Sequence, residues 1–246
     1  MQCLSIVIPS FHSKSLTEIA VKSFVHFCPK SISLEIIVIE NSDDESYKNE
    51  ILNISDSVVW INNDKKIFGS EANASALELG AEIAKNDMVF FAHCDICVTS
   101  SKFYSEIFRK YEEGNRAVGM LYDNHPDRIN ALHILGLLTE KSIVKSVDLY
   151  PKYKGKIQIL DVGDSITSYC RDNNIPYFSF ENTYNDSKLK VEKPYEDFSV
   201  VRTISQDGEV IYMHLGRGIA KNENRYRKKN RVMIDDWVHF CNILMG

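Results

Sequence analysis

Short apolar runs alternate regularly with helix-like segments over the first hundred residues of this chain. The apolar runs are rich in β-branched residues, and the segments between them carry apolar residues at helical spacing. Strands separated by helices predict βαβ units, and near-continuous apolar strands predict a mostly parallel sheet covered by helices on both faces. The expected strands are 4–8, 34–39, 58–61 and 88–92, and the expected helices are 16–27, 46–52 and 70–84.

Polar residues follow every one of these strands. The carboxyl ends of parallel strands meet at one edge of a sheet, where α/β proteins bind their ligands. The sequence therefore predicts a ligand site at this edge. The polar clusters are Pro9-Ser10, Glu40-Asn41, Asn62-Asn63 and His93-Cys94-Asp95.

The second half of the chain is less regular. It predicts helices over 101–113 and 165–173, strands over 117–121 and 209–214, and a loop over 184–197. No segment has the composition of a linker, and a chain of 246 residues can form one sizeable core. We therefore expect a single domain over residues 1–246.

Composition excludes several classes of protein. A net charge of −5 argues against a general nucleic-acid binder, which has a strongly basic domain. No apolar run approaches the ~20 residues that span a bilayer. Most of the six cysteines lie in apolar segments and no secretory signal precedes them, so we expect reduced thiols and a cytoplasmic protein.

The segment His93-Cys94-Asp95 ends the fourth strand. Strand alternation would place His93 and Asp95 on one side and Cys94 on the other. A carboxylate at this place suits a divalent cation that bridges phosphates, although aspartate is also common in turns and helix caps. Cys94 and Cys97 form the only CxxC, and without a second ligand pair we interpret both as packing residues.

Four motifs in this order resemble the family 2 glycosyltransferases, which have the GT-A fold. They are LSIVIPSF, IIVIENSDD, a G-x-x-x-N from Gly69 to Asn73 and the apolar strand that ends in His93-Cys94-Asp95. The resemblance covers roughly residues 3–98. It implies that residues 1–98 bind a nucleotide-diphosphate sugar, with UDP favoured, and that residues 99–246 form the acceptor side.

What the resemblance implies is an inverting transfer of a sugar, of hexosyltransferase type, to an acceptor hydroxyl in surface glycan or polysaccharide synthesis. The acceptor would be a glycan or a lipid-linked glycan. The residues that match the family's nucleotide-sugar site are Pro9, Ser10, Phe11, Glu40 (where Asp is more usual), Asn41, Gly69, Asn73, His93, Asp95 and Arg217.

The family's D-x-D motif binds a divalent metal, and here it reads His93-Cys94-Asp95. The resemblance implies Asp95 as the metal ligand, His93 in place of the first carboxylate, and His214, a late histidine before a glycine-containing loop, as a third ligand. An imidazole ligand would favour Mn²⁺ over Mg²⁺. A second departure is Ala72, where the family often has arginine.

The resemblance places the general base at Asp161 or Asp164, before the helix expected at 165–173. Asp161 is favoured, because Asp164 is interpreted as the N-cap of that helix; both could also be turn residues. Residues 221–231 hold six basic residues, which form either a solvated helix face or a contact with anionic lipid at the inner face of a membrane. Residues 232–244 would pack on the core or on a partner.

Two alternatives remain open from the sequence. The His93 substitution fits a degenerate GT-A module that binds without turnover. A nucleotidyltransferase also uses an α/β sheet and a metal-binding carboxylate, but residues 9–12 lack the glycines of its phosphate loop.

Overall fold

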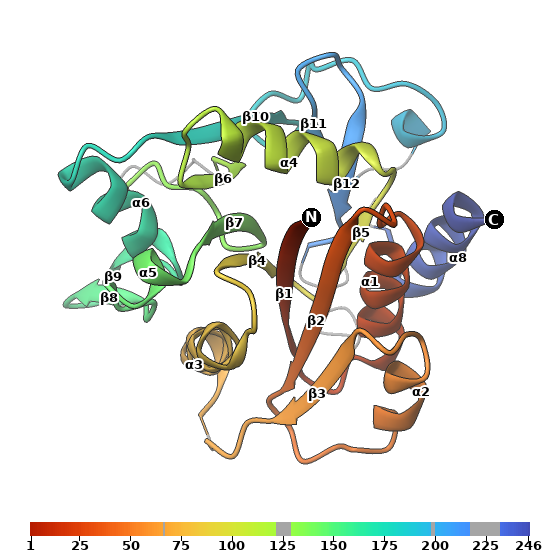
Figure 1. Ribbon diagram of the computed structural model, residues 1–246, viewed down its shortest axis with the longest axis horizontal. Helices are drawn as coiled ribbons and strands as arrows, with labels where there is room; N and C mark the ends of the chain where they lie inside the picture. The colour runs from red at the N-terminus through yellow and green to blue at the C-terminus, as the bar shows by residue number, and fades with distance from the viewer. Residues whose placement is uncertain (66, 122–128, 198–199, 217–231) are drawn as a thin grey trace.

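The structure is a computed structural model, and it describes residues 1–65, 67–121, 129–197, 200–216 and 232–246 (Figure 1). The strands are β1 Gln2–Ser10, β2 Ile32–Glu40, β3 Val58–Asn62, β4 Met88–Ala92, β5 Ile96–Val98, β6 Ala117–Met120, β7 Gly136–Glu140, β8 Lys152–Lys154, β9 Ile157–Leu160, β10 Tyr177–Asn182, β11 Val201–Ile204 and β12 Val210–His214. The helices are α1 Lys14–His26, α2 Lys48–Leu52, α3 Gly69–Ile83, α4 Lys102–Glu112, α5 Lys141–Val144, α6 Asp164–Asp172 and α8 Ile234–Met245, with a 3₁₀ turn η1 at Tyr195–Asp197.

One large sheet has the strand order β3-β2-β1-β4-β7-β6-β10-β11-β12-β5. The strands β3-β2-β1-β4 run parallel, as do β6 and β10, and the remaining neighbours are antiparallel. This arrangement confirms the predicted α/β class. The register sets Ser10 beside Glu40 and Glu40 beside Asn62, so the polar strand ends line up along one edge.

The two faces of the sheet carry separate apolar clusters, because alternate residues of a strand point to opposite faces. In β1, Ile6 and Ile8 pack in the cluster shared with α1, α4 and α8, whereas Val7 packs in the cluster shared with α3 and α6. Figure 1 shows α1 and α8 on one side of β1 and β2 and α3 on the other. The helices thus cover both faces of the parallel part.

The C-terminal helix α8 packs on the core. Its Trp237 and Cys241 are fully buried, and the helix contacts α1. Of the two expectations for residues 232–244, the core contact is therefore confirmed. The basic residues of segment 221–231 lie outside the described residues. Among the residues that the structure does describe, no helix is long and apolar enough to cross a membrane.

A candidate metal centre at the carboxyl edge of the sheet

His93 and Asp95 lie in the tight turn that joins β4 to β5. The Ile96 amide donates to the His93 carbonyl at 3.3 Å, which closes the turn. Cys94 packs in the core, where its sulfur accepts from the Ser13 hydroxyl at 3.5 Å. The predicted separation of the three side chains is confirmed, but a turn rather than strand alternation produces it.

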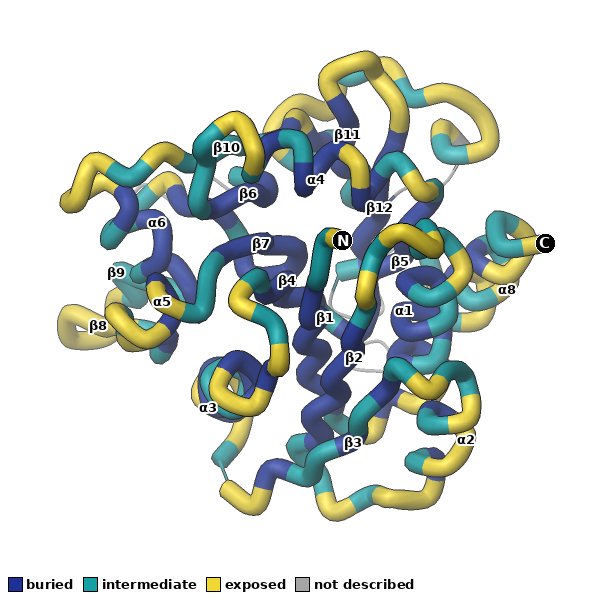
Figure 2. The backbone as a smooth tube through the Cα atoms, in the orientation of Figure 1, coloured by how far each residue is buried: buried dark blue, intermediate teal, exposed yellow. Residues whose placement is uncertain are grey.

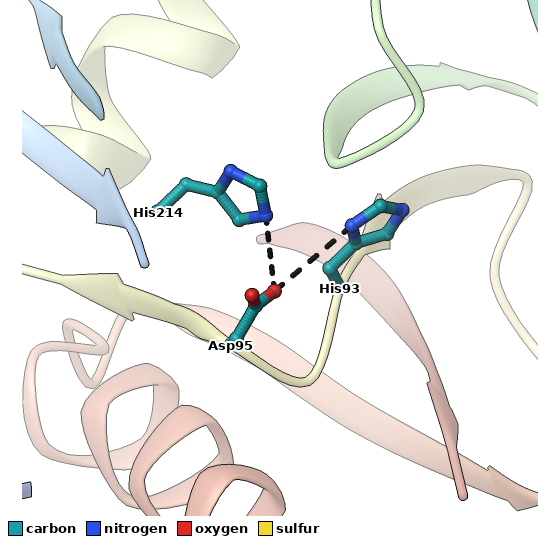
Figure 3. Close-up of side chains that lie close together, drawn as sticks. All are labelled: His93, Asp95 and His214. Carbon is teal, nitrogen blue, oxygen red and sulfur yellow. Dashed lines mark ion pairs between the residues drawn. The ribbon is translucent and has the colours of Figure 1, made fainter. Parts of the chain in front are cut away.

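His214 reaches this turn because β12 pairs with β5. The antiparallel register sets His214 opposite Ile96, and the Leu215 amide donates to the Asp95 carbonyl at 3.0 Å. Figure 3 shows the imidazoles of His93 and His214 on either side of the Asp95 carboxylate. Asp95 Oδ1 lies 3.0 Å from His214 Nε2 and 4.0 Å from His93 Nδ1.

Two of the three residues are buried, and His93 is half-buried. Asp95 is 4% exposed and His214 is 7% exposed. Burial, and to a smaller extent the neighbouring His214, lower the pKa of His93 to about 4. The charges of Asp95 and Asp161 act in the opposite direction. His93 is therefore a neutral imidazole near pH 7, with a nitrogen lone pair available to a ligand.

These residues fit a divalent metal ion. The three side chains offer one ligand atom each, all within 4.8 Å of one another. The Nε2 atom of His93 is buried and makes no hydrogen bond with any described residue, and the Nε2 atom of His214 faces the Asp95 carboxylate at 3.0 Å. Two imidazole nitrogens and one carboxylate oxygen suit a transition metal such as Mn²⁺ better than Mg²⁺. Cys94 is not part of the set. It packs in the apolar core, where burial and the Asp95 charge raise the pKa of its thiol to about 12.

Glu40 lies at the same sheet edge but is fully buried. Its carboxylate accepts from the Ser42 amide at 2.9 Å, from the Ser42 hydroxyl at 2.5 Å and from the Tyr47 hydroxyl. Burial and this contact with Glu40 raise the pKa of Tyr47 above its ordinary value. Glu40 thus fixes the loop after β2 through its hydrogen bonds to Ser42 and Tyr47.

The other residues predicted to bind the nucleotide sugar are spread along this edge. Pro9 and Ser10 are buried in the last part of β1, and the Ser10 hydroxyl is within hydrogen-bond distance of Ser13, Thr17 and Tyr47. Phe11 follows at the surface and is half-buried. Asn41 is also half-buried, and its side-chain oxygen accepts from Asn63 Nδ2 at 2.8 Å.

Helix α3 begins at Gly69, which is exposed and has a φ of 64°, a left-handed conformation that favours glycine. Asn73 lies one turn further along and is half-buried. Phe68, at the N-cap, is 75% exposed. Arg217 lies outside the described residues.

Asp161 and Asp164 take different places before α6. The helix begins at Asp164 and its N-cap is Gly163, so the interpretation of Asp164 as the N-cap is off by one residue. The buried Asp164 carboxylate accepts from the Asp161 amide at 2.7 Å and so holds the loop. The Asp161 carboxylate accepts from Gln158 Nε2 at 3.0 Å and is close enough to His93 to act on its charge.

Two residues near the cluster gave no signal in the sequence. The ring of His133 lies 5.8 Å from the ring of His93, and its Nδ1 accepts from the Leu135 amide at 3.1 Å. His133 stands alone in an apolar run, where a histidine that packs in the core is the ordinary interpretation. Gln158 lies in a short strand that the pattern does not reveal.

The sequence matches no protein-family model and no curated protein. The fold is similar to that of the mannosyltransferase PcManGT from Pyrobaculum calidifontis in complex with GDP-Man and Mn²⁺, with a TM-score of 0.53 and 8% identity over 72% of this chain and 54% of that one. This likeness shows the fold, which is that of the GT-A glycosyltransferases.

Two further solved structures resemble the chain more weakly. TarS 1–349 from S. aureus in complex with UDP has a TM-score of 0.46 and 13% identity over 62% of this chain and 50% of that one. Glucosyl-3-phosphoglycerate synthase from Mycobacterium tuberculosis has a TM-score of 0.46 and 12% identity over 59% of each chain. The chain thus spans about half the length of the solved structures that it resembles.

Proposed function

We propose that this protein is a metal-dependent glycosyltransferase that moves a sugar from a nucleotide-diphosphate sugar to an acceptor hydroxyl. One observation carries the proposal: His93, Asp95 and His214 converge at the carboxyl edge of the parallel strands of a GT-A-type fold. Ligands of α/β sheets bind at this edge. The protein of similar fold, PcManGT, is in complex with a nucleotide sugar and Mn²⁺.

In this proposal His93, Asp95 and His214 hold the divalent ion. When bound, the ion neutralises charge on the diphosphate leaving group. The neutral state of His93 keeps its ring nitrogen able to coordinate, and the Asp95 carboxylate supplies the negative charge of the set. Phe11, Asn41 and Asn73 are partly exposed residues of the predicted nucleotide-sugar site, and in this proposal their side chains contact the donor.

Asp161 is the general base of the proposed reaction. Its carboxylate takes the proton of the acceptor hydroxyl as the oxygen attacks the anomeric carbon, and a single carboxylate suffices for an inverting displacement. Gln158 orients Asp161 through the bond at 3.0 Å, and Asp164 fixes the Asp161 backbone. Asp164 therefore serves as a positioning residue.

The finer parts of the proposal follow the family resemblance. We assign a UDP-sugar of hexose type as donor and a glycan under construction, free or lipid-linked, as acceptor. The site would lie in the cytoplasm, at the inner face of the membrane when the acceptor is lipid-linked. Residues 1–98 would hold the donor and residues 99–246 the acceptor.

The test is donor hydrolysis and transfer with a panel of UDP-, GDP- and dTDP-sugars in Mn²⁺, measured as nucleotide release. Asp95→Ala should reduce turnover at least about 100-fold, because it removes the carboxylate of the metal set. Asp56→Ala, which removes an exposed carboxylate elsewhere, should leave turnover unchanged.

Calorimetry with nucleotide and Mn²⁺ separates the alternatives. Tight nucleotide binding without turnover would support a binding module in place of the enzyme. If no nucleotide sugar binds, the proposed function is wrong.

A further inference from the structure

The hairpin formed by β8 and β9 is a small sheet of its own beside α5 and α6 (Figure 1). Its tip is the two-residue turn Gly155-Lys156, and Figure 2 colours this tip as exposed. Isolated two-stranded hairpins are marginally stable and gain little from exposed apolar side chains. Even so, Tyr153 is 55% exposed and Ile157 is 50% exposed.

The hairpin also concentrates positive charge in an acidic protein. Residues 152–160 hold three lysines and no acidic residue, whereas the whole chain has a net charge of −5. Lys152 Nζ lies 3.9 Å from Asp148 Oδ2. Lys154 and Lys156 are exposed and form no ion pair with any residue that the structure describes. Their charge is therefore available to an anionic partner.

The exposed ring is connected to the candidate active site. Tyr153 pairs with Gln158 across the hairpin, so their side chains share one face. Gln158 Nε2 in turn donates to Asp161 Oδ1 at 3.0 Å, and Asp161 acts electrostatically on His93 of the metal cluster. A molecule bound on the Tyr153 face therefore lies next to Gln158, which donates a hydrogen bond to the proposed base Asp161.

From these contacts we propose that the β8–β9 hairpin is the docking surface for the acceptor, and that the acceptor is an anionic glycan chain. The apolar face of one sugar ring packs on the Tyr153 ring, and carboxylate or phosphate substituents of other sugars along the chain pair with Lys154, on the opposite face of the strand, and with Lys156 at the tip. The inference rests on the proposed function, because it names the acceptor class of that same site. The link through Gln158 to Asp161 favours a glycan acceptor over a membrane surface.

The test uses oligogalacturonate of about ten sugars, labelled with fluorescein, and its methyl ester, which has the same rings without the charge. Binding is measured by fluorescence anisotropy at low salt. The double variant Lys154→Glu/Lys156→Glu should weaken binding of the acid about tenfold or more, and the methyl ester should bind at least about tenfold more weakly than the acid to the unaltered protein.

Lys188→Glu/Lys190→Glu is the matched control, because it makes the same charge change at two exposed lysines with the same spacing. It should change binding less than about twofold. Tyr153→Ala should weaken both the acid and the ester, which share the sugar rings. All these side chains are exposed, so the variants should keep the far-UV circular dichroism of the unaltered protein.

Three results would overturn the inference: equal binding by the two double variants, no preference for the acid over the ester, or binding only to vesicles that contain phosphatidylglycerol. Donor hydrolysis to water is measured on the same samples. The hairpin variants should keep it, whereas Asp95→Ala should lose it. No binding of the acid glycan by an unaltered protein that hydrolyses donor would thus refute the docking surface alone, and absence of hydrolysis in the unaltered protein would refute the proposed function.

Discussion

His93 stands where a carboxylate would give the candidate metal site a second oxygen ligand and more negative charge. With two imidazoles and a single carboxylate, the cluster favours metals that accept nitrogen ligands. The substitution His93→Asp would restore a second carboxylate beside Asp95. We expect the ratio of Mg²⁺-supported to Mn²⁺-supported turnover to rise about tenfold, because Mg²⁺ prefers oxygen ligands.

The measurement is nucleotide release at saturating donor with each metal in turn. His133→Gln is the control, since this ring lies near His93 but outside the three-residue set. It should keep the Mn²⁺ preference. An unchanged metal ratio in His93→Asp would show that His93 does not coordinate the ion.

The lowered pKa of His93 also makes the stability of the metal-free protein depend on pH. Its ordinary pKa of about 6.5 applies to the unfolded chain, and in the folded protein it is about 4. The unfolded state therefore binds a proton first, and stability falls as the pH drops from about 6.5 to about 4 and then levels off. Because the side chain is 27% exposed, we expect a loss of at most about 2 kcal/mol near pH 4.5.

Urea unfolding in EDTA at pH 7.5, 5.5 and 4.5 measures this loss. His93→Gln has no titrating group at this position. The free energy of unfolding of the unaltered protein minus that of His93→Gln should therefore decrease as the pH falls. Carboxylates elsewhere titrate in both proteins and cancel in that difference. Parallel pH profiles would contradict the prediction.

At the scale of single elements, α3 packs against β1 through a glycine. A Cβ added to Gly80 would lie 2.2 Å from Val7 Cγ1, too close for any real contact. Because Val7 is fully buried in the apolar cluster that β1 shares with α3 and α6, the neighbouring side chains have little room to shift. Gly80→Ala should therefore lower the free energy of unfolding by about 1–3 kcal/mol, in spite of the better helix propensity of alanine.

Urea unfolding measures this loss as well. Glu82→Ala lies on the same helix at an exposed position and should change the free energy of unfolding by less than about 0.5 kcal/mol. A Gly80→Ala variant as stable as this control would show that α3 sits further from β1 than the structure has it.

The first-half elements were predictable because each is specified by residues close in sequence. The pattern of β1 to β4 and α1 to α3 alternates every few residues, and all seven expected elements occur within a few residues of their predicted bounds. In the second half, helices at 102–112 and 164–172 and strands at 117–120 and 210–214 were also found. The strands β5, β7, β8, β9, β10 and β11 were missed. Of these, β5, β7, β10 and β11 pair with strands far along the chain, which a local pattern does not reveal.

The candidate site was predictable only in part for the same reason. His93 and Asp95 stand two positions apart, and a local pattern suffices to pair them. The pairing of β12 with β5 brings His214 to the site, and from the sequence only the family resemblance indicated His214 as a ligand. Nothing local indicated that Glu40 would be buried by Tyr47 and Ser42, or that Gln158 would hold Asp161.

At the scale of the whole molecule, we expect the proposed donor and acceptor halves to unfold together. β5 belongs to the first half and pairs with β12, β4 pairs with β7, and α8 packs on α1. The chain has two tryptophans, Trp60 in β3 and Trp237 in α8, which report on opposite ends of the sequence. Each can be followed alone by replacing the other with phenylalanine.

The fluorescence midpoints of Trp60→Phe and Trp237→Phe in urea should each coincide with the far-UV circular dichroism midpoint of the same variant, as in a cooperative transition. Separate midpoints within one variant would indicate two units in place of one domain. Both rings are largely buried, so each variant is compared with its own dichroism rather than with the unaltered protein.

The pairing of β12 with β5 has a consequence for how the site could be divided. Because His214 and Asp95 meet only across this strand pair, a fragment that ends before β12 contains just two of the three candidate ligands. Two complementary fragments, cut in the exposed turn at Gly155, would each lack part of the set and regain it on reassembly. A divalent ion that binds the complete set would then favour the reassembled pair, so that the strength of fragment complementation becomes a readout of metal binding.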